Sequence, residues 1–517
     1  MMLALELRRV VRGAEADVGR RWHAKAERDR NAHALARRQE FLAQTRCERG
    51  ARRLIVGRAQ DLSGAHQWCG LPIEQLTSQH VGVSGATGMG KSYLLATLLW
   101  QLLRARVPVV VVDLKSELCA ILLETIVPAL VASGREDLAE QVRVIRPFDP
   151  ARVPLLRLTE PEREVSAQVQ SLNIATALGE AIGQDHGVRM QRLLLPAAGL
   201  AVERNLPLPI VLEWLRDPAR FAREAATSSD PTIRAYAIHE LPRENRSSLD
   251  AVRARLDLLF HLSEIRRALS APRCIDFHEC LRSGVTLLDF GSPPGGAEGA
   301  MRFIAGPVVG RLSRAILSRQ VSADTPQAVV LFEEFQELLH RHQIEQFKRL
   351  LSLCRFKKVA LHFSNQQPAQ IAAADRTLLK VLRTNLGAEM IFRSSVEDAR
   401  ALSEGLSIRS PEETLAQART RLIEEIASLP RRAFFLWLKS APFGPQRLTS
   451  PRLDLDALRR AAATLPADTR ERIQAGVASV NRAEVDGVLA AEQAAIVRLP
   501  QILPLEDERR VRAPRLG

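Results

Sequence analysis

The sequence predicts an α/β fold with a central, mostly parallel β-sheet, an inserted all-α domain and helical extensions at both ends. A glycine-punctuated loop separates an apolar strand from a helix in HVGVSGATGMGKSYLLATLLWQLL, residues 80–103. Continuous apolar runs such as VPVVVVDLKSE, residues 107–117, are typical of strands that helices cover on both faces. From about residue 155 to 270, the apolar pattern has only the helical period.

The first segment, residues 1–53, is rich in alanine and arginine and predicts a basic helical arm. Two interpretations stay open for this arm: a solvated or partly disordered helix, and an arm that binds nucleic acid or a partner. Gly, Pro and short apolar groups in residues 54–74 indicate a small β-rich lead into the first central strand.

The loop after that strand fits the pattern G-x-x-x-x-G-K-[ST] at Gly85, Gly90, Lys91 and Ser92. Backbone N–H groups of such a loop, with the N-terminus of the next helix, bind phosphate oxygens. We expect Lys91 to reach the β- and γ-phosphates of ATP and Ser92 to bind Mg²⁺. The residues expected to line the nucleotide are Gly85, Ala86, Thr87, Gly88, Met89, Gly90, Lys91, Ser92 and Tyr93.

The remaining elements divide the chain into four further parts. Residues 54–154 predict the first part of the nucleotide-binding domain, residues 155–275 an all-α insertion, residues 276–450 the second part, and residues 451–517 a helical tail. Polar residues at the carboxyl end of the 107–117 run lie where open α/β sheets bind ligands. Further strands are expected in VRVIRPFDP (142–150), GVTLLDFG (284–291), QAVVLFEEFQELL (327–339), KVALHFSNQQPAQI (358–371), GAEMIFRSS (387–395) and RAFFLWLKS (432–440).

Two adjacent acids end the apolar strand VVLFEEF. A phosphate-binding loop needs one acid that holds Mg²⁺ through water and one that orients or deprotonates the attacking water. We assign Glu333 to the metal and Glu334 to the water. Because aspartate is commoner at the metal position, the division of the two roles stays open.

The next strand ends in SNQQPAQI, where Gln366 or Gln367 is expected to hydrogen-bond the γ-phosphate or the attacking water. Eleven residues before Gln366, the turn CRFKK carries Arg355. An arginine on such a turn can reach from one subunit to the nucleotide of its neighbour. The alternative for this basic turn is a solvated surface loop.

Charge and composition narrow the classes of function. The 517 residues include 73 Lys and Arg against 59 Asp and Glu, a net charge of +14 that indicates a polyanionic partner, nucleic acid before an anionic membrane. A solvated arginine-rich surface is the alternative. The six cysteines lack metal-ligand spacing and predict reduced thiols. No apolar stretch approaches the roughly 18 residues of a membrane span. A cytoplasmic location is therefore expected, and a peripheral place at the inner membrane stays open.

The motifs together resemble a known family. HVGVSGATGMGKS, DLKSE, the long helical insertion, VVLFEEF, CRFKKVALHFSNQQPAQ and NLGAEMIFRSSVEDARAL follow the order and spacing of the type IV coupling proteins of conjugation. These proteins belong to the FtsK/HerA class of DNA-pumping ATPases. The resemblance covers about residues 54 to 445. One departure is that coupling proteins usually begin with membrane-spanning helices, and no such helix is predicted here.

The resemblance implies a RecA-like domain that binds ATP and Mg²⁺ and assembles into a ring, commonly a hexamer, around DNA. It also implies that Arg355 is an arginine finger and that Gln366 is the glutamine of the strand after the double acid. Three functions follow as alternatives. They are a DNA translocase, a soluble adaptor ATPase that recruits a protein substrate to a secretion machine, and a HerA-like helicase partner of a nuclease. A relaxosome, a secretion machine or a nuclease is accordingly a possible partner.

Overall fold

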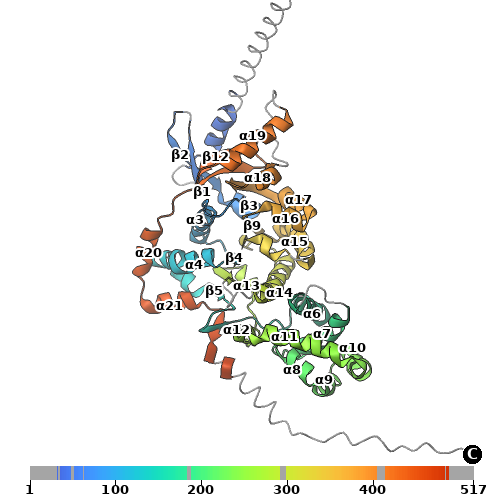
Figure 1. Ribbon diagram of the computed structural model, residues 1–517. Coiled ribbons are helices and arrows are strands. Elements are labelled where there is room, and N and C mark those ends of the chain that lie inside the picture. The colour runs from blue at the N-terminus through green and yellow to red at the C-terminus, as the bar shows by residue number, and fades with distance from the viewer. Residues whose placement is uncertain are drawn as a thin grey trace, which may run out of the picture.

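The computed structural model describes residues 32, 35–47, 52–61, 63–182, 188–291, 298–339, 341–403, 414–483 and 485–487. Within them an 11-stranded sheet forms the centre of the molecule (Figure 1). Its strands are β1 (Arg53–Gln60), β2 (His66–Pro72), β3 (His80–Ser84), β4 (Val109–Asp113), β5 (Val142–Ile145), β7 (Val285–Asp289), β8 (Ala328–Glu333), β9 (Val359–Asn365), β10 (Leu386–Phe392), β11 (Ala433–Leu438) and β12 (Gln446–Thr449).

The strands follow the order β2-β1-β12-β11-β10-β3-β9-β8-β4-β7-β5. All neighbours from β10 to β5 are parallel, as the continuous apolar runs predicted. The pairings among β10, β11, β12, β1 and β2 are antiparallel. The sheet is therefore mostly parallel, with an antiparallel edge on the side of β10.

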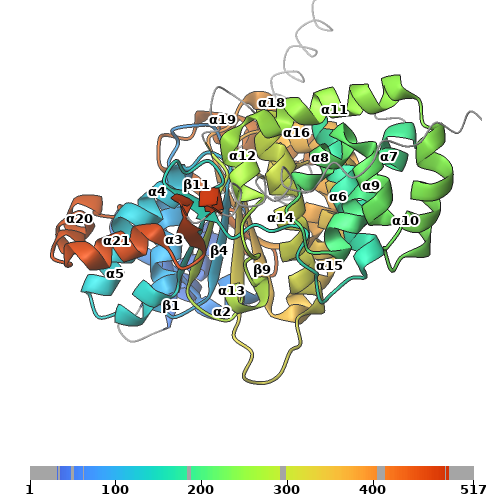
Figure 2. The same ribbon diagram turned by 90° about the horizontal axis from the view of Figure 1, so that it is seen from below.

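Helices cover both faces of the parallel part because its strands are apolar on both sides. Val109 and Val111 of β4 belong to one buried cluster, whereas Val110 and Val112 belong to another. The first cluster packs against α3 (Lys91–Arg104), α4 (Glu117–Ile121) and α5 (Val127–Ala132). The second packs against α14 (Glu298–Ser318) and α15 (Arg341–Leu353). Figure 2 shows these two groups of helices on opposite sides of the strands.

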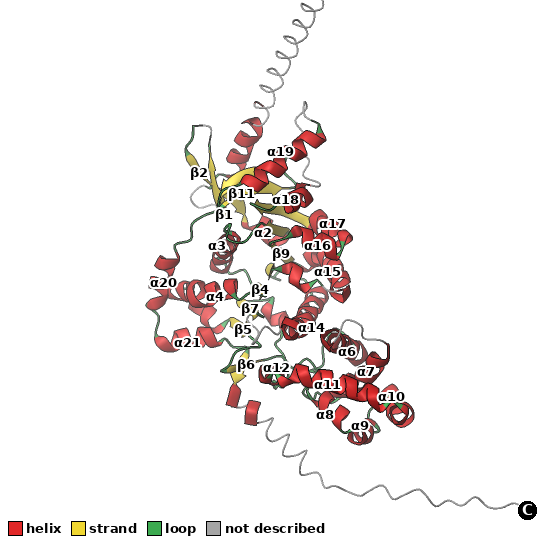
Figure 3. Cartoon of the chain, in the orientation of Figure 1, coloured by secondary structure: helices red, strands yellow, loops and turns green. Residues whose placement is uncertain are grey.

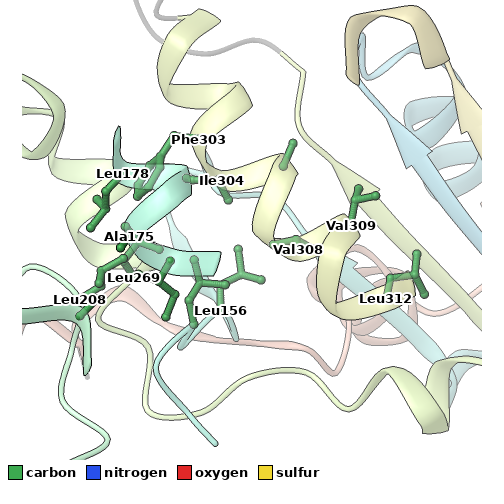
Figure 4. Packing of buried hydrophobic residues seen from close by; sticks show 14 of the residues in the cluster. Leu156, Ala175, Leu178, Leu208, Leu269, Phe303, Ile304, Val308, Val309 and Leu312 are labelled. Atoms are coloured by element: carbon green, nitrogen blue, oxygen red, sulfur yellow. The ribbon is translucent and has the colours of Figure 1, made fainter. Parts of the chain in front are cut away.

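The described residues between β6 (Arg152–Pro154) and β7 are mainly helical, and Figure 3 shows most of these helices as a red group at the lower right. An isolated bridge between Leu156 and Cys274 brings the two ends of this segment together. Ala175 and Leu178 pack near Phe303 and Ile304 of α14 (Figure 4). The main helices are α6 (Ala167–Ile182), α7 (Val188–Glu203), α8 (Ile210–Arg216), α9 (Pro218–Ala225), α10 (Pro231–Ala235), α11 (Arg246–His261) and α12 (Ser263–Ala268).

The two terminal segments are only partly described, but their described parts pack on the body. Residues 35–45 are helical, and Phe41 is fully buried with its ring centroid 5.2 Å from that of Phe443. This end of the predicted arm is therefore packed rather than solvated. The tail forms α20 (Leu455–Ala463), α21 (Ala467–Ala475) and a short strand β13 (Ser479–Asn481) that pairs with β6. Most of 1–53 and the residues after 487 lie outside the described part.

Membrane anchoring was the feature in which the sequence departed from the coupling proteins. Among the residues that the structure describes, no helix is both long and apolar enough to cross a membrane.

Candidate nucleotide-binding site

The loop that joins β3 to α3 requires glycine at its start. Gly85 has a φ of +149°, and a Cβ there would lie 2.5 Å from Cβ of Phe392. Gly90, the last loop residue, also has a positive φ of +107°. The N–H of Gly85 donates to the carbonyl oxygen of Asn365 at 3.3 Å, which ties the loop to the end of β9. Local backbone geometry thus explains two glycines of the motif.

Lys91 places its ammonium group inside this loop. Its Nζ donates to the carbonyl oxygen of Gly85 at 2.5 Å and to that of Ala86 at 3.1 Å. Burial lowers the pKa of Lys91, and the carboxylates of Glu334 and Glu333 oppose that shift. A buried cation facing two acids is well placed to meet phosphate oxygens.

Ser92 and Glu333, the two residues expected to bind Mg²⁺, are in contact. The Ser92 hydroxyl donates to Oε1 of Glu333 at 3.2 Å. Oε2 of Glu333 is buried and has no hydrogen-bond partner in the described part of the chain. Burial raises the pKa of Glu333 to about 8, and Asp113, its cross-strand partner on β4, adds to that shift. Once this carboxyl gives up its proton, its unpaired oxygen beside a hydroxyl is a donor set that fits Mg²⁺.

Glu334 is the centre of a hydrogen-bond network. It has a φ of +56°, in the left-handed region where non-glycine residues are uncommon. Its Oε1 accepts from Nε2 of Gln366 and its Oε2 from Nε2 of Gln336, both at 2.5 Å. Lys115 Nζ lies 3.2 Å from Oε1. Thr87 of the loop donates its hydroxyl to Oε1 of Gln366 at 2.6 Å. One glutamine therefore joins the phosphate loop to the second acid.

The sheet order explains why these distant residues meet. Strand β9 lies between β3 and β8, and all three are parallel. Ser84 pairs with Asn365, and Glu333 pairs with Ser364. The carboxyl ends of the loop strand, the glutamine strand and the acid strand therefore share one edge, where open α/β sheets bind ligands.

Arg355 is far from this edge within the same chain. It lies on the short helical turn η7 (Cys354–Lys357), which precedes β9, while Gln366 follows the other end of that strand. The 7 residues of β9 extend roughly 20 Å at about 3.3 Å per residue. The side chain of Arg355 is exposed, and so is that of its neighbour Phe356, at 80%. The structure thus unites all the predicted site residues except Arg355.

Two further residues contact the site, although no role there was predicted for them. Lys115 belongs to DLKSE, whose position after a strand was a signal for a ligand-binding edge. Gln336 follows the double acid by two positions and gave no separate signal. Between the two candidate glutamines, Gln366 contacts Glu334, whereas Gln367 is the exposed N-cap of α16 (Pro368–Ala374).

A comparison with known protein families gave a match that includes the phosphate loop. Residues 56–274 match the family model described as helicase HerA, central domain. The predicted resemblance to the FtsK/HerA class is confirmed. Comparison with curated proteins gave no match.

Solved structures of two proteins resemble this chain over most of their length. The bacterial conjugative coupling protein TrwBdeltaN70, unbound, is 14% identical with a TM-score of 0.52, over 80% of this chain and 91% of that chain. VirB4 of Thermoanaerobacter pseudethanolicus is 10% identical with a TM-score of 0.53, over 80% of this chain and 99% of that one. At such identities the likeness shows the fold, a RecA-like P-loop fold as expected.

Proposed function

We propose that this chain hydrolyses ATP with Mg²⁺ and uses the hydrolysis to move or recruit DNA through a ring of its own copies, as in conjugative DNA transfer. The observation that carries this proposal is the hydrogen-bonded chain from Thr87 through Gln366 to Glu334, beside the buried Lys91. It joins a phosphate-binding loop to an acid in the geometry that nucleotide hydrolysis requires.

Each residue of the site has a distinct part in this reaction. Lys91 faces the β- and γ-phosphates, and the loop backbone binds the remaining phosphate oxygens. Glu334 accepts the proton of the attacking water, and Gln366 orients that water or the γ-phosphate. Ser92 and Glu333 would hold Mg²⁺, which would neutralise charge on the phosphates when bound.

Structures of TrwB support a purine nucleotide and Mg²⁺ as ligands of such a site, and one of them is a complex with the GTP analogue GDPNP. Another is a complex with the non-hydrolysable ATP analogue ADPNP, and a third is a complex with ADP and Mg²⁺. TrwB is a conjugative coupling protein, and VirB4 has the same fold. We transfer these properties here on the strength of the shared fold and the site described above.

The position of Arg355 supports assembly into a ring. It lies at the edge of the sheet opposite its own phosphate loop, so an arginine finger at this position has to act on the nucleotide of another copy. A head-to-tail ring in which the amino edge of one subunit faces the carboxyl edge of the next would bring it there. Arg355 is then an arginine finger that stabilises transition-state charge on the neighbouring ATP.

The excess of basic residues supports DNA as the substrate of the motor. Lys and Arg outnumber Asp and Glu by 73 to 59. Contacts of such residues with the phosphate backbone are independent of sequence and allow a protein to slide along DNA. A motor that moves DNA requires that property.

The test is the steady-state rate of ATP hydrolysis with and without single- and double-stranded DNA, with Lys91→Ala as the control. We expect DNA to raise the rate and added salt to weaken the effect. A rate that DNA leaves unchanged, in a protein that hydrolyses ATP, would instead support an adaptor ATPase that recruits a protein.

The family match favours one second candidate, a HerA-like helicase that acts with a nuclease. It uses the same site and the same ring, but it separates DNA strands for a partner. Strand separation of a forked duplex, dependent on ATP, would favour this candidate over simple translocation.

A further inference from the structure

One buried side chain, His80, binds both ends of the segment that carries Arg355. His80 is the first residue of β3 and is fully buried. Its Nε2 lies 3.1 Å from the carbonyl oxygen of Leu351, near the end of α15. Its Nδ1 accepts the backbone N–H of Leu361, in β9, at 3.0 Å. The imidazole thus connects the two ends of the segment 351–361.

These two bonds fix the protonation state of the imidazole. Because Nδ1 accepts an N–H, it carries no proton, and Nε2–H is the donor to Leu351. Burial lowers the pKa of His80 to about 4, and the positive charge of Arg355 also lowers it. The ring is therefore neutral at physiological pH and close enough to Arg355 to interact with its charge.

Other contacts fix the base of the segment while its tip stays exposed. Cys354 is buried, and its Sγ lies 3.6 Å from Nε2 of His80. On the other side, Arg319 donates from Nη1 to the carbonyl oxygens of Lys357 at 3.2 Å and Lys358 at 3.1 Å. Because the two ends of the segment are held in place, the exposed arginine loses less conformational entropy when it binds a partner.

We infer that His80 is a positioning residue for Arg355, and that through it β3 links the phosphate loop of one site to the arginine that serves the next. The inference rests on the proposed function, since Arg355 matters only to a neighbouring copy. β3 has 5 residues, with His80 at one end and Gly85 of the loop directly after the other. A shift of this strand therefore reaches both the loop and the turn.

The variant His80→Asn tests the link with a small change. The asparagine carbonyl can still accept the N–H of Leu361, but the shorter side chain cannot reach Leu351. We expect ATP turnover to fall about 10- to 100-fold, the range for an ångström-scale displacement of a catalytic group. Nucleotide affinity should stay within about threefold, because an arginine finger contributes little to ground-state binding.

His362 offers a matched control on β9. It is also buried, burial lowers its pKa to about 4 as well, and its Nε2 lies 2.8 Å from the carbonyl oxygen of Leu76 in α2 (Ile73–Ser78). His362→Asn should lower thermal stability as His80→Asn does, but it should keep the wild-type turnover. Equal losses of turnover in the two variants would show a general effect on the core and overturn the inference.

Mixed assemblies locate the defect. His80→Asn subunits keep their own Glu334, so mixing them with Glu334→Gln subunits, whose Arg355 is intact, should restore activity. Mixing His80→Asn with Arg355→Ala should not restore it. The reverse pattern would place the defect in the phosphate loop of the same subunit and overturn the inference.

The mixture of Arg355→Ala with Glu334→Gln separates this inference from the proposed function. If that mixture gains no activity, the proposed ring with Arg355 as an arginine finger is wrong, and the inference about His80 is wrong with it. If it gains activity while His80→Asn with Glu334→Gln does not, only the inference fails.

If His80→Asn does not fold, His80→Gln is tested in the same mixtures. Its amide keeps both a donor and an acceptor, so a smaller loss of turnover is expected, with the same pattern of rescue.

Discussion

At the scale of single residues, the clearest prediction concerns the substitution of Lys91. Its ammonium group lies among the loop carbonyls, where phosphate oxygens are expected to bind. Lys91→Ala should abolish ATP turnover, because the cation that meets the β- and γ-phosphates is lost. Circular dichroism should show an unchanged fold. Substantial hydrolysis by the purified variant would remove the loop from the catalytic site.

The two acids should give different phenotypes. Glu334→Gln keeps the size of the side chain and one acceptor oxygen but loses the base, so the variant should trap bound ATP. Glu333→Gln should weaken Mg²⁺-dependent binding, because a carboxylate beside Ser92 is lost. Nucleotide binding and turnover are measured for both variants. The opposite pattern would exchange the two roles.

The sequence predicted most site residues because their chemistry requires a short local pattern. Gly85, Lys91 and Ser92 lie within 8 consecutive positions, and Glu333 and Glu334 are adjacent. The choice of Gln366 over Gln367 depended on the direction of one side chain at a strand end. The contact of Gln336 with Glu334 was not predictable, because this hydrogen bond depends on the folded backbone after β8.

At the scale of elements, the sequence predicted the parallel strands, β11 and the β-rich segment of β1 and β2, but it predicted neither β12 nor the antiparallel pairing at that edge. Strands buried on both faces appear in the sequence as apolar runs such as VVVVD in β4. β12 has only 4 residues, QRLT, with alternating burial, and such a short pattern is weak evidence for a strand. The order in which strands pair depends on long-range packing, which local patterns do not encode.

The two buried histidines in β3 and β9 predict acid sensitivity of the fold. Burial lowers the pKa of both His80 and His362 to about 4, below the ordinary value of 6.5. As the pH falls from 6.5 to 4, the unfolded chain takes up protons that the folded chain does not, so stability is lost. Each histidine contributes up to about 1.4 kcal/mol per pH unit.

The variant His362→Asn measures one of these contributions. We expect its free energy of unfolding to depend less steeply on pH than that of the wild type between pH 4 and 6.5, and equally above that range. Urea unfolding at several pH values gives both curves. Parallel curves throughout would mean that His362 is not held neutral in the folded chain.

At the scale of the whole molecule, the helical insertion and the sheet have separate positions but share one buried cluster. Leu156, Ala175 and Leu178 belong to the same cluster as Val110 of β4 and Val330 of β8. The sequence predicted the insertion from its helical period alone. It did not predict that the described end of the arm packs against the body through Phe41, because charge dominates that segment.

Assembly is the property on which the proposed motor depends. A single chain separates Arg355 from its own Glu334 by the full length of β9. Arginine fingers contribute about 10³ to 10⁵ in rate but little to nucleotide binding. Arg355→Ala alone should therefore bind ATP nearly normally and fail to hydrolyse it.

The most direct measurement of a site shared between copies is the ATPase rate of Arg355→Ala mixed with Glu334→Gln, compared with each variant alone. In a ring, an intact Glu334 on one subunit then faces an intact Arg355 on the next, and we predict that the mixture recovers activity. A mixture no more active than either variant alone, or a fully active monomer, would contradict both the arginine finger and the ring.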